Sequence, residues 1–178
     1  MKTTPSPESQ NHAKERRSIT HIYMALILSI VLQFVPVLAV QLFGAVLLLV
    51  VMAAAYVVRG PKDRDSLSTN HMTYLIGTIW IGSLFLSIGM GIATAWFLEA
   101  GNHTLFHQMI DGMMEGAVIP EDMIEARFID YLKDNMALLV KIGLATVMPS
   151  LIYIAYRIWK GLSRAVKGYR IARPKSWF

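Results

Sequence analysis

The chain has 178 residues, of which 54% are hydrophobic and only 16% are charged. Soluble domains carry about a quarter charged residues, so this composition indicates a membrane protein with one compact domain. The absence of cysteine excludes disulfides, thiolate metal sites and cysteine nucleophiles. The net charge of +5 does not indicate nucleic acid, because the basic residues lie in short segments beside apolar runs, as they do in membrane proteins.

Residues 1–18 are polar and are predicted to form a disordered cytoplasmic tail. They include the basic cluster Lys14, Arg16 and Arg17, which is typical of a cytoplasmic charge anchor. A cleaved signal peptide is the alternative, since a basic segment leads into an apolar one. The apolar stretch is too long for that role and no clean small-x-small cleavage site follows it, so we favour an uncleaved tail.

Residues 19–58 contain no Asp, Glu, Lys or Arg. Forty helical residues would measure about 60 Å, twice the hydrocarbon thickness of a bilayer, so this run must fold back. Gln33, Pro36 and Gln41 mark the reversal, because proline breaks the helical hydrogen bonds and amides prefer the interface. A re-entrant hairpin that never leaves the membrane is the alternative. The prediction is two spans, 19–36 and 39–58.

A third charge-free run predicts a span at 72–97. Small residues recur there at every fourth position and therefore share one face of the helix: Ser83, Ser87, Gly91 and Ala95. In lipid, no hydrophobic force brings helices together, and close packing must do much of that work. This small-residue stripe is therefore predicted to be a helix-packing site.

The segment 99–136 is an acidic insert with two amphipathic helical patterns, interrupted at Gly116 and Pro120. The apolar residues of the two patterns are Leu105, Met109, Ile110, Met113 and Met114, and Met123, Ile124, Phe128, Ile129 and Leu132. These faces need cover. They lie on the membrane surface, pack on each other or bind a partner.

Two histidines in the insert, His103 and His107, are spaced i and i+4 and lie beside several methionines. Such a pair can chelate a metal, and thioethers favour Cu(I). A solvated amphipathic helix explains the same residues, and no second ligand cluster completes a site. We therefore predict no metal and no cofactor, with these two histidines as weak candidates.

The last span is predicted at 137–159, with a kink at Pro149. The segment 160–178 that follows is basic and has an apolar side, which predicts an interfacial helix against anionic lipid headgroups. The residues expected to contact those headgroups are Arg164, Lys167, Arg170 and Arg173.

The distribution of charge predicts the topology. The N-terminal tail, the 59–70 linker and the stretch 157–178 hold four, three and seven of the 17 Lys and Arg residues, whereas 98–141 holds eight of the 12 acids. Four transmembrane helices with both termini inside satisfy the positive-inside rule. The predicted fold is therefore an all-α membrane protein, N-in and C-in, with an outward-facing helical insert between the third and fourth spans.

Several short motifs resemble a family of small bacterial inner-membrane proteins, mostly uncharacterised and distantly grouped with the chloroplast inner-envelope import component. They are Ala55-Tyr56-Val57-Val58-Arg59-Gly60, Asn70-His71, Ile76-Gly77-Thr78-Ile79-Trp80-Ile81, Tyr156-Arg157-Ile158-Trp159-Lys160-Gly161 and Arg173-Pro174. Gly77 stands where that family usually has arginine, and the outward insert is unusually long. The resemblance implies a location in the bacterial inner membrane and no particular reaction.

Few residues could carry chemistry. His71, at the inner mouth of the third span, could handle protons, but we favour a hydrogen-bonding role at the helix start beside Asn70. No Asp or Glu lies inside a predicted span, and no nucleotide, zinc-protease or serine-hydrolase motif occurs. We therefore expect no enzyme. The prediction is an accessory or assembly subunit that contacts other membrane proteins or itself. The alternative is a small oligomeric transport or translocation component.

Overall fold

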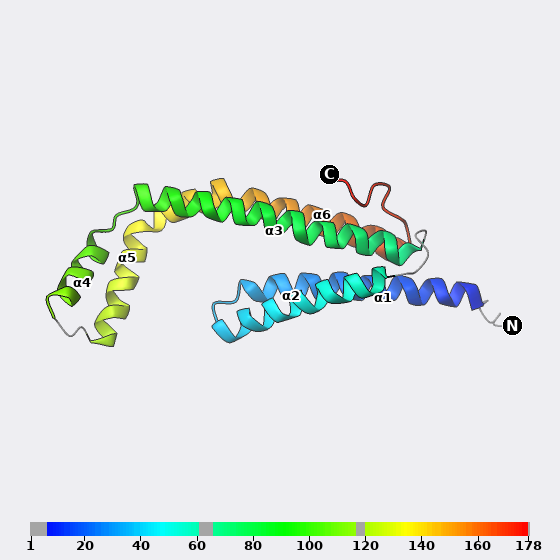
Figure 1. The fold of residues 1–178 in the computed structure, drawn as a ribbon, viewed down its shortest axis with the longest axis horizontal. Helices are drawn as coiled ribbons and strands as arrows, with labels where there is room; N and C mark the ends of the chain where they lie inside the picture. Colours follow the sequence, from blue (N-terminus) through cyan, green and yellow to red (C-terminus); the bar gives the residue numbers. More distant parts are fainter. Residues whose placement is uncertain (1–6, 61–65, 117–119, 178) are drawn as a thin grey trace. The chain divides into compact units, whose positions relative to one another are not determined.

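The computed structural model describes residues 7–60, 66–116 and 120–177, and within these ranges the only regular structure is helical. The elements are α1 (Pro7–Gln33), α2 (Leu38–Arg59), α3 (Leu67–Ala100), α4 (Thr104–Met114), α5 (Glu121–Ile142), the π-helix η1 (Gly143–Val147) and α6 (Met148–Lys167) (Figure 1). The predicted all-α class is therefore confirmed.

Within the described ranges, three helical stretches are long and apolar enough to cross a membrane: Leu38–Arg59, Leu67–Ala100 and Glu121–Lys167. They indicate a membrane-associated protein. The first predicted span, 19–36, is not among them, because α1 ends at Gln33 and its uncharged part from Ile19 measures only about 22 Å. The four-span topology and its orientation stay predictions.

The chain divides into two compact units: a first unit of Met1–Leu84 and Ile152–Phe178, and a second unit of Phe85–Leu151. The core of the first unit combines four helices. Its buried apolar residues are Ile19, Tyr23 and Leu26 of α1, Val51 and Ala55 of α2, Met72, Leu75 and Ile76 of α3, and Ile158 and Ala165 of α6. Helices α1 and α2 form a hairpin. At its closed end a Cβ on Gly44 would lie 2.9 Å from the Leu32 Cβ, so glycine permits the close approach.

Residues 7–18 differ from the sequence prediction, because α1 begins at Pro7 and they are helical rather than disordered. The physical reason lies in a contact far along the chain. The Glu15 carboxylate accepts hydrogen bonds from the backbone N–H of Ser68 at 2.8 Å and from its hydroxyl at 2.6 Å. A carboxylate is favourable at a helix N-terminus, and here it joins α1 to the first turn of α3.

The basic C-terminal segment also differs from its prediction as one interfacial helix. Helix α6 ends at Lys167, and Gly168 follows with a φ of 74°. Tyr169 N–H bonds the Arg164 carbonyl at 2.9 Å and Gly168 N–H bonds the Ala165 carbonyl at 3.0 Å, which is the pattern of a glycine helix stop. Residues 169–177 then return as an irregular segment, which we call the C-terminal strap.

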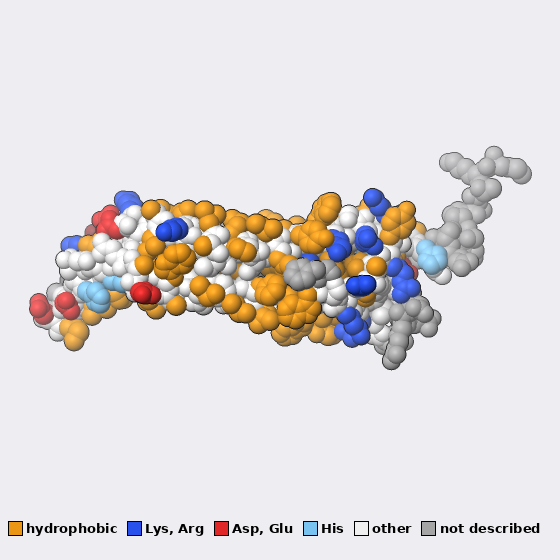
Figure 2. Space-filling model, turned by 90° about the horizontal axis from the view of Figure 1, so that it is seen from above, with side chains coloured by type: hydrophobic (Ala, Val, Ile, Leu, Met, Phe, Trp, Pro, Cys, Tyr) orange, Lys and Arg blue, Asp and Glu red, His pale blue; other side chains and the backbone are white. Residues whose placement is uncertain are grey.

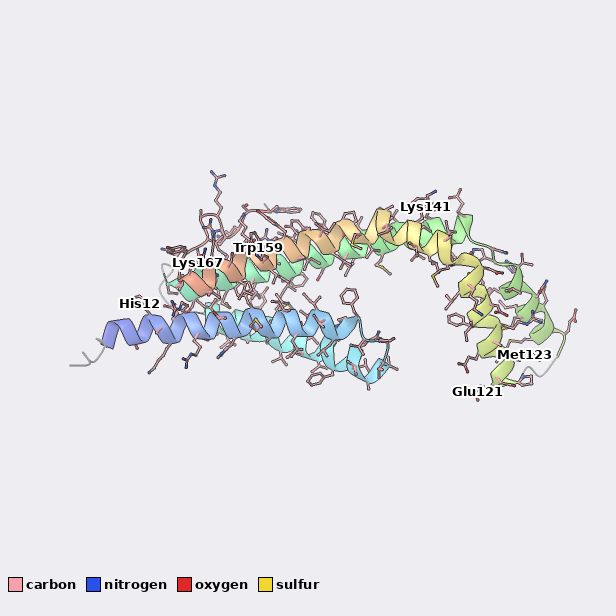
Figure 3. The ribbon with its side chains drawn as sticks, turned by 180° about the vertical axis from the view of Figure 1, so that it is seen from behind. His12, Glu121, Met123, Lys141, Trp159 and Lys167 are labelled. Atoms are coloured by element: carbon pink, nitrogen blue, oxygen red, sulfur yellow. The ribbon has the colours of Figure 1, made fainter. Side chains whose placement is uncertain are left out.

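In the second unit, the insert and the last predicted span are joined without a break. Helix α5 begins at Glu121 and continues through η1 into α6, and Figure 3 marks Glu121 and Met123 in its first turn. Pro149, the position of the predicted kink, lies in the first turn of α6 just after η1, and the Met148 N–H bonds the Gly143 carbonyl. Proline has no N–H to donate, which disturbs the preceding helical turn.

Candidate functional site

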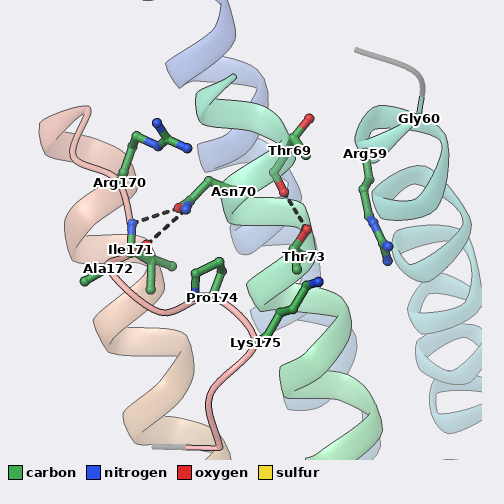
Figure 4. A pocket seen from close by; sticks show the side chains of 10 residues that line it. All are labelled: Arg59, Gly60, Thr69, Asn70, Thr73, Arg170, Ile171, Ala172, Pro174 and Lys175. Atoms are coloured by element: carbon green, nitrogen blue, oxygen red, sulfur yellow. Dashed lines mark hydrogen bonds between the residues drawn. The ribbon is translucent and has the colours of Figure 1, made fainter. Parts of the chain in front are cut away.

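The first unit holds a polar junction where α3 meets the C-terminal strap. The Asn70 side chain is 7% exposed and pairs with the backbone of Ile171 in both directions (Figure 4). Its Nδ2 donates to the Ile171 carbonyl at 2.9 Å, and its Oδ1 accepts from the Ile171 N–H at 2.8 Å. One side chain thus satisfies two buried backbone groups and fixes the course of the strap.

His71, one residue on, is fully buried. Its Nε2 lies 3.0 Å from the Tyr169 carbonyl oxygen, and its ring meets the Tyr23 ring edge-on at 6.0 Å between centroids. The hydrogen bond goes to the strap, not to the start of its own helix as the sequence analysis favoured. Among the residues that the structure describes, neither the His71 Nδ1 nor the Tyr23 hydroxyl has a hydrogen-bond partner.

Arg157 is the residue that sequence reasoning missed, and its side chain in α6 is only 1% exposed. Its Nε donates to the Thr78 hydroxyl at 3.0 Å, and its guanidinium lies 4.1 Å from the centre of the Tyr74 ring. Its Nη1 reaches three oxygens: the Tyr153 hydroxyl at 3.2 Å and the carbonyls of Ser176 at 2.7 Å and Trp177 at 2.8 Å.

Neutral groups therefore solvate this buried cation within the described residues. Burial of a charge is costly unless hydrogen bonds replace its water. The contacts of Nε and Nη1 supply part of that replacement, whereas Nη2 has no hydrogen-bond partner among the described residues. They also attach the end of the strap to α3 and α6. The available sequence signal was an arginine inside the predicted span 137–159 with Tyr153 four residues before it, because ionisable residues inside a membrane span usually have a function.

A polar cavity of about 730 Å³ lies beside the junction (Figure 4). Arg59 and Gly60 come from the end of α2, and Thr69, Asn70 and Thr73 from the first turns of α3. The strap supplies the rest of the described lining: Arg170, Ile171, Ala172, Pro174 and Lys175. Three cationic side chains thus line one cavity, Arg59 from α2 and Arg170 and Lys175 from the strap. The described lining includes no carboxylate.

The predicted headgroup residues belong to this basic end of the first unit, where Lys and Arg gather beside an apolar band (Figure 2). Arg164 is half-buried, and its Nη1 donates to the Arg170 carbonyl at 3.0 Å. Lys167, Arg170 and Arg173 are exposed. Only Arg170 of the four lines the cavity.

The predicted small-residue stripe does not take part in the packing of the chain on itself. Ser83, Ser87, Gly91 and Ala95 are all exposed, and a Cβ built on Gly91 would meet nothing within 4 Å.

Two other glycines of α3 make close contacts instead. A Cβ on Gly82 would lie 2.7 Å from Ile154 Cγ1, and one on Gly89 would lie 2.5 Å from the Thr146 carbonyl oxygen. At about 100° per residue, their face is roughly 170° from the stripe. The Gly82 and Gly89 contacts and the stripe therefore lie on opposite sides of α3.

The two candidate metal ligands, His103 and His107, lie beside aromatic rings and a backbone carbonyl. His103 uses both ring nitrogens, because Nδ1 lies 2.8 Å from the Tyr131 hydroxyl and Nε2 lies 3.2 Å from the Leu98 carbonyl. His107 stands against the Phe106 ring. Among the residues placed by the structure, no three His, Cys, Asp or Glu side chains group as metal ligands. His103 thus serves to hold α4 against α5.

These features define an all-helical, membrane-associated protein whose polar centre is a cationic junction under the C-terminal strap. No known protein family, curated protein or solved structure matches the chain. The resemblance of its short motifs to a bacterial membrane family therefore stays an expectation.

Proposed function

We propose that this chain is a non-catalytic, multi-pass membrane protein that serves as an accessory or assembly subunit. It binds another membrane protein through the small-residue stripe of α3 and through the insert. The observation that supports this most is the position of the stripe: it is exposed and lies opposite the Gly82 and Gly89 contacts. A partner helix can approach it without displacing the contacts of Gly82 and Gly89.

The insert supports the same proposal by its apolar exposure. Helix α4 has no buried residue, and the described part of the insert covers only some of its apolar side chains. Leu105, Met109, Ile110 and Leu132 are half-buried, whereas Met114 is 82% exposed and Phe128 is 57% exposed. Flexible methionines and an aromatic ring on an open surface are typical of protein-binding faces.

The proposed topology has four spans, both termini in the cytoplasm and the insert outside, in a bacterial inner membrane. The asymmetry of Lys and Arg supports it. The contact of Lys141 with Trp96, 5.9 Å from the ring centre, fits an outer interface at the end of α3. A reporter fused at the C-terminus should be cytoplasmic, and one inserted near Gly116 external. An external C-terminus would refute the four-span topology.

The stripe is tested by Gly91→Leu, which fills its middle with a branched side chain. The variant should insert and keep its unfolding temperature, while recovery of a complex from gently solubilised membranes falls at least fivefold. Gly143→Leu is the matched control, because its Cβ would also meet nothing within 4 Å and the site lies on another helix. Gly89→Leu should instead lower the unfolding temperature.

Undiminished recovery of the complex with Gly91→Leu would contradict the proposal. A homo-oligomer that carries flux in liposomes would favour the alternative function, a small transport component.

A further inference from the structure

We propose that the cavity between the end of α2, the start of α3 and the C-terminal strap binds a phosphate group, that of an anionic phospholipid at the cytoplasmic surface. The inference rests on the membrane placement proposed above and adds a specific ligand site to it. It differs from general attraction of a basic tail to lipid, because it names a built pocket and its residues.

The chemistry of the lining fits an anion. Arg59, Arg170 and Lys175 bring three positive charges from two segments that are more than 100 positions apart in the sequence. Arginine offers a planar fork of donors that matches phosphate oxygens, and lysine adds a point charge. The Thr69 hydroxyl accepts from the Ser66 hydroxyl at 2.9 Å, which leaves its own proton available to a ligand oxygen.

The shape of the cavity depends on the position of the strap, which the hydrogen bonds of Asn70 and Arg157 fix. The pair of hydrogen bonds between Asn70 and Ile171 fixes the strap as one wall. The bonds from Arg157 to the carbonyls of Ser176 and Trp177 fix the end of the same strap. At about 730 Å³, the space lies within the range of about 300–1,000 Å³ usual for ligand pockets.

The depth of the cavity fits a lipid headgroup. Trp80 Nε1 donates to the Tyr56 hydroxyl at 3.0 Å, and both rings are exposed, as aromatic residues are where a bilayer meets water. Arg59 follows Tyr56 by three residues, or about 4.5 Å of helix. The headgroup layer is about 5–7 Å thick on each side of the hydrocarbon core, so Arg59 falls within it.

A lipid is therefore favoured over a wholly soluble ligand, since the pocket opens at the level where phospholipid phosphates lie. Basic pockets at the cytoplasmic ends of membrane helices are known sites for acidic headgroups.

The test uses the purified full chain in neutral detergent, titrated with short-chain phosphatidylglycerol and, in parallel, with short-chain phosphatidylcholine. The pocket variant carries Arg59→Gln and Lys175→Gln. The matched control carries Lys167→Gln and Arg173→Gln, two exposed residues outside the cavity, and changes the net charge equally. We expect the parent to prefer phosphatidylglycerol at least tenfold. The pocket variant should lose at least tenfold in affinity for it and the control less than threefold.

Asn70→Ala provides a second variant that leaves every charge in place. It should also weaken phosphatidylglycerol binding, because the wall carrying Arg170 and Lys175 is released. Equal losses in the pocket variant and the charge-matched control would overturn the proposal and assign binding to diffuse charge. No loss in the pocket variant would overturn it as well. Preserved elution and unfolding temperature of both double variants show that each is folded.

Inorganic phosphate distinguishes the source of the ligand. If millimolar phosphate displaces phosphatidylglycerol from the parent chain, the pocket accepts free phosphate. If it does not, the pocket requires the lipid. The measurement uses the isolated chain, so loss of lipid binding and loss of a protein complex through Gly91→Leu can occur independently. If one of the two proposals fails, the other can still be tested.

Discussion

Two asparagines show how the same local device works in different surroundings. Asn70 pairs with the backbone of Ile171 across 101 positions, and Asn135 pairs with the backbone of Asn102 across 33. The bonds are similar: Asn135 Oδ1 accepts from the Asn102 N–H at 2.7 Å, and its Nδ2 donates to the carbonyl at 3.0 Å. Both asparagines are buried. The two asparagines differ in whether the residue whose backbone they hydrogen-bond is itself buried.

Around Asn70 the partner is buried as well. Ile171 is 4% exposed, and the neighbouring contacts of His71 and Arg157 reach the same strap. Around Asn135 the partner Asn102 is exposed, and the adjacent α4 has no buried residue. In the first unit, the backbone that Asn70 pairs with is therefore closed off from solvent by the same chain. In the second unit, the backbone that Asn135 pairs with belongs to an exposed residue.

Loss of the Asn70 side chain should have the largest effect. Asn70→Ala leaves the N–H and the carbonyl of Ile171 without partners, and each unsatisfied buried group costs about 1–3 kcal/mol. The total of about 2–6 kcal/mol corresponds to a fall in unfolding temperature of roughly 4–24 °C for a chain of this size. Thermal unfolding in mild detergent measures it, and trypsin should cut the strap at Arg170 and Lys175 faster than in the parent.

Asn70→Asp is the informative companion, since it keeps the acceptor for the Ile171 N–H and removes the donor. Its fall should be smaller than that of the alanine variant. An unchanged unfolding temperature for Asn70→Ala would mean that the strap is not part of the folded core.

Much of the helical framework could be predicted from local sequence. The uncharged run with Gln33 and Pro36 indicated a reversal, and the structure turns after Gln33, where Gln41 Nε2 donates to the Gln33 carbonyl at 3.4 Å. The charge-free third run became part of α3, and Pro149 marked the irregular turn of the last helix. These features depend on residues that are neighbours along the chain, so their patterns are visible in sequence.

The junction could not be predicted in the same way. Arg157 entered the sequence analysis only as one basic residue among many, because its burial depends on Thr78 and on Ser176, which are 79 and 19 positions away. The return of the strap depends on the left-handed turn at Gly168, and an amphipathic basic tail gives no sign of it. The choice of Gly82 and Gly89 over the stripe was equally hidden, since both faces of α3 carry small residues.

A smaller loss of stability is expected for a change at Asn135, the corresponding asparagine of the second unit. Asn135→Ala removes the bonds to the backbone of Asn102, but Asn102 is exposed and water can take the place of the lost partners. The expected cost is about 1 kcal/mol, a fall of roughly 2–4 °C in unfolding temperature. The connection between α3 and α4 keeps a second link, because His103 still bonds Tyr131. Hydrogen exchange should therefore speed up at the Asn102 amide and hardly at all in the strap. A fall as large as that of Asn70→Ala would show that the insert belongs to the same cooperative core as the junction. The two units would then differ only in the exposure of the backbone that each asparagine contacts.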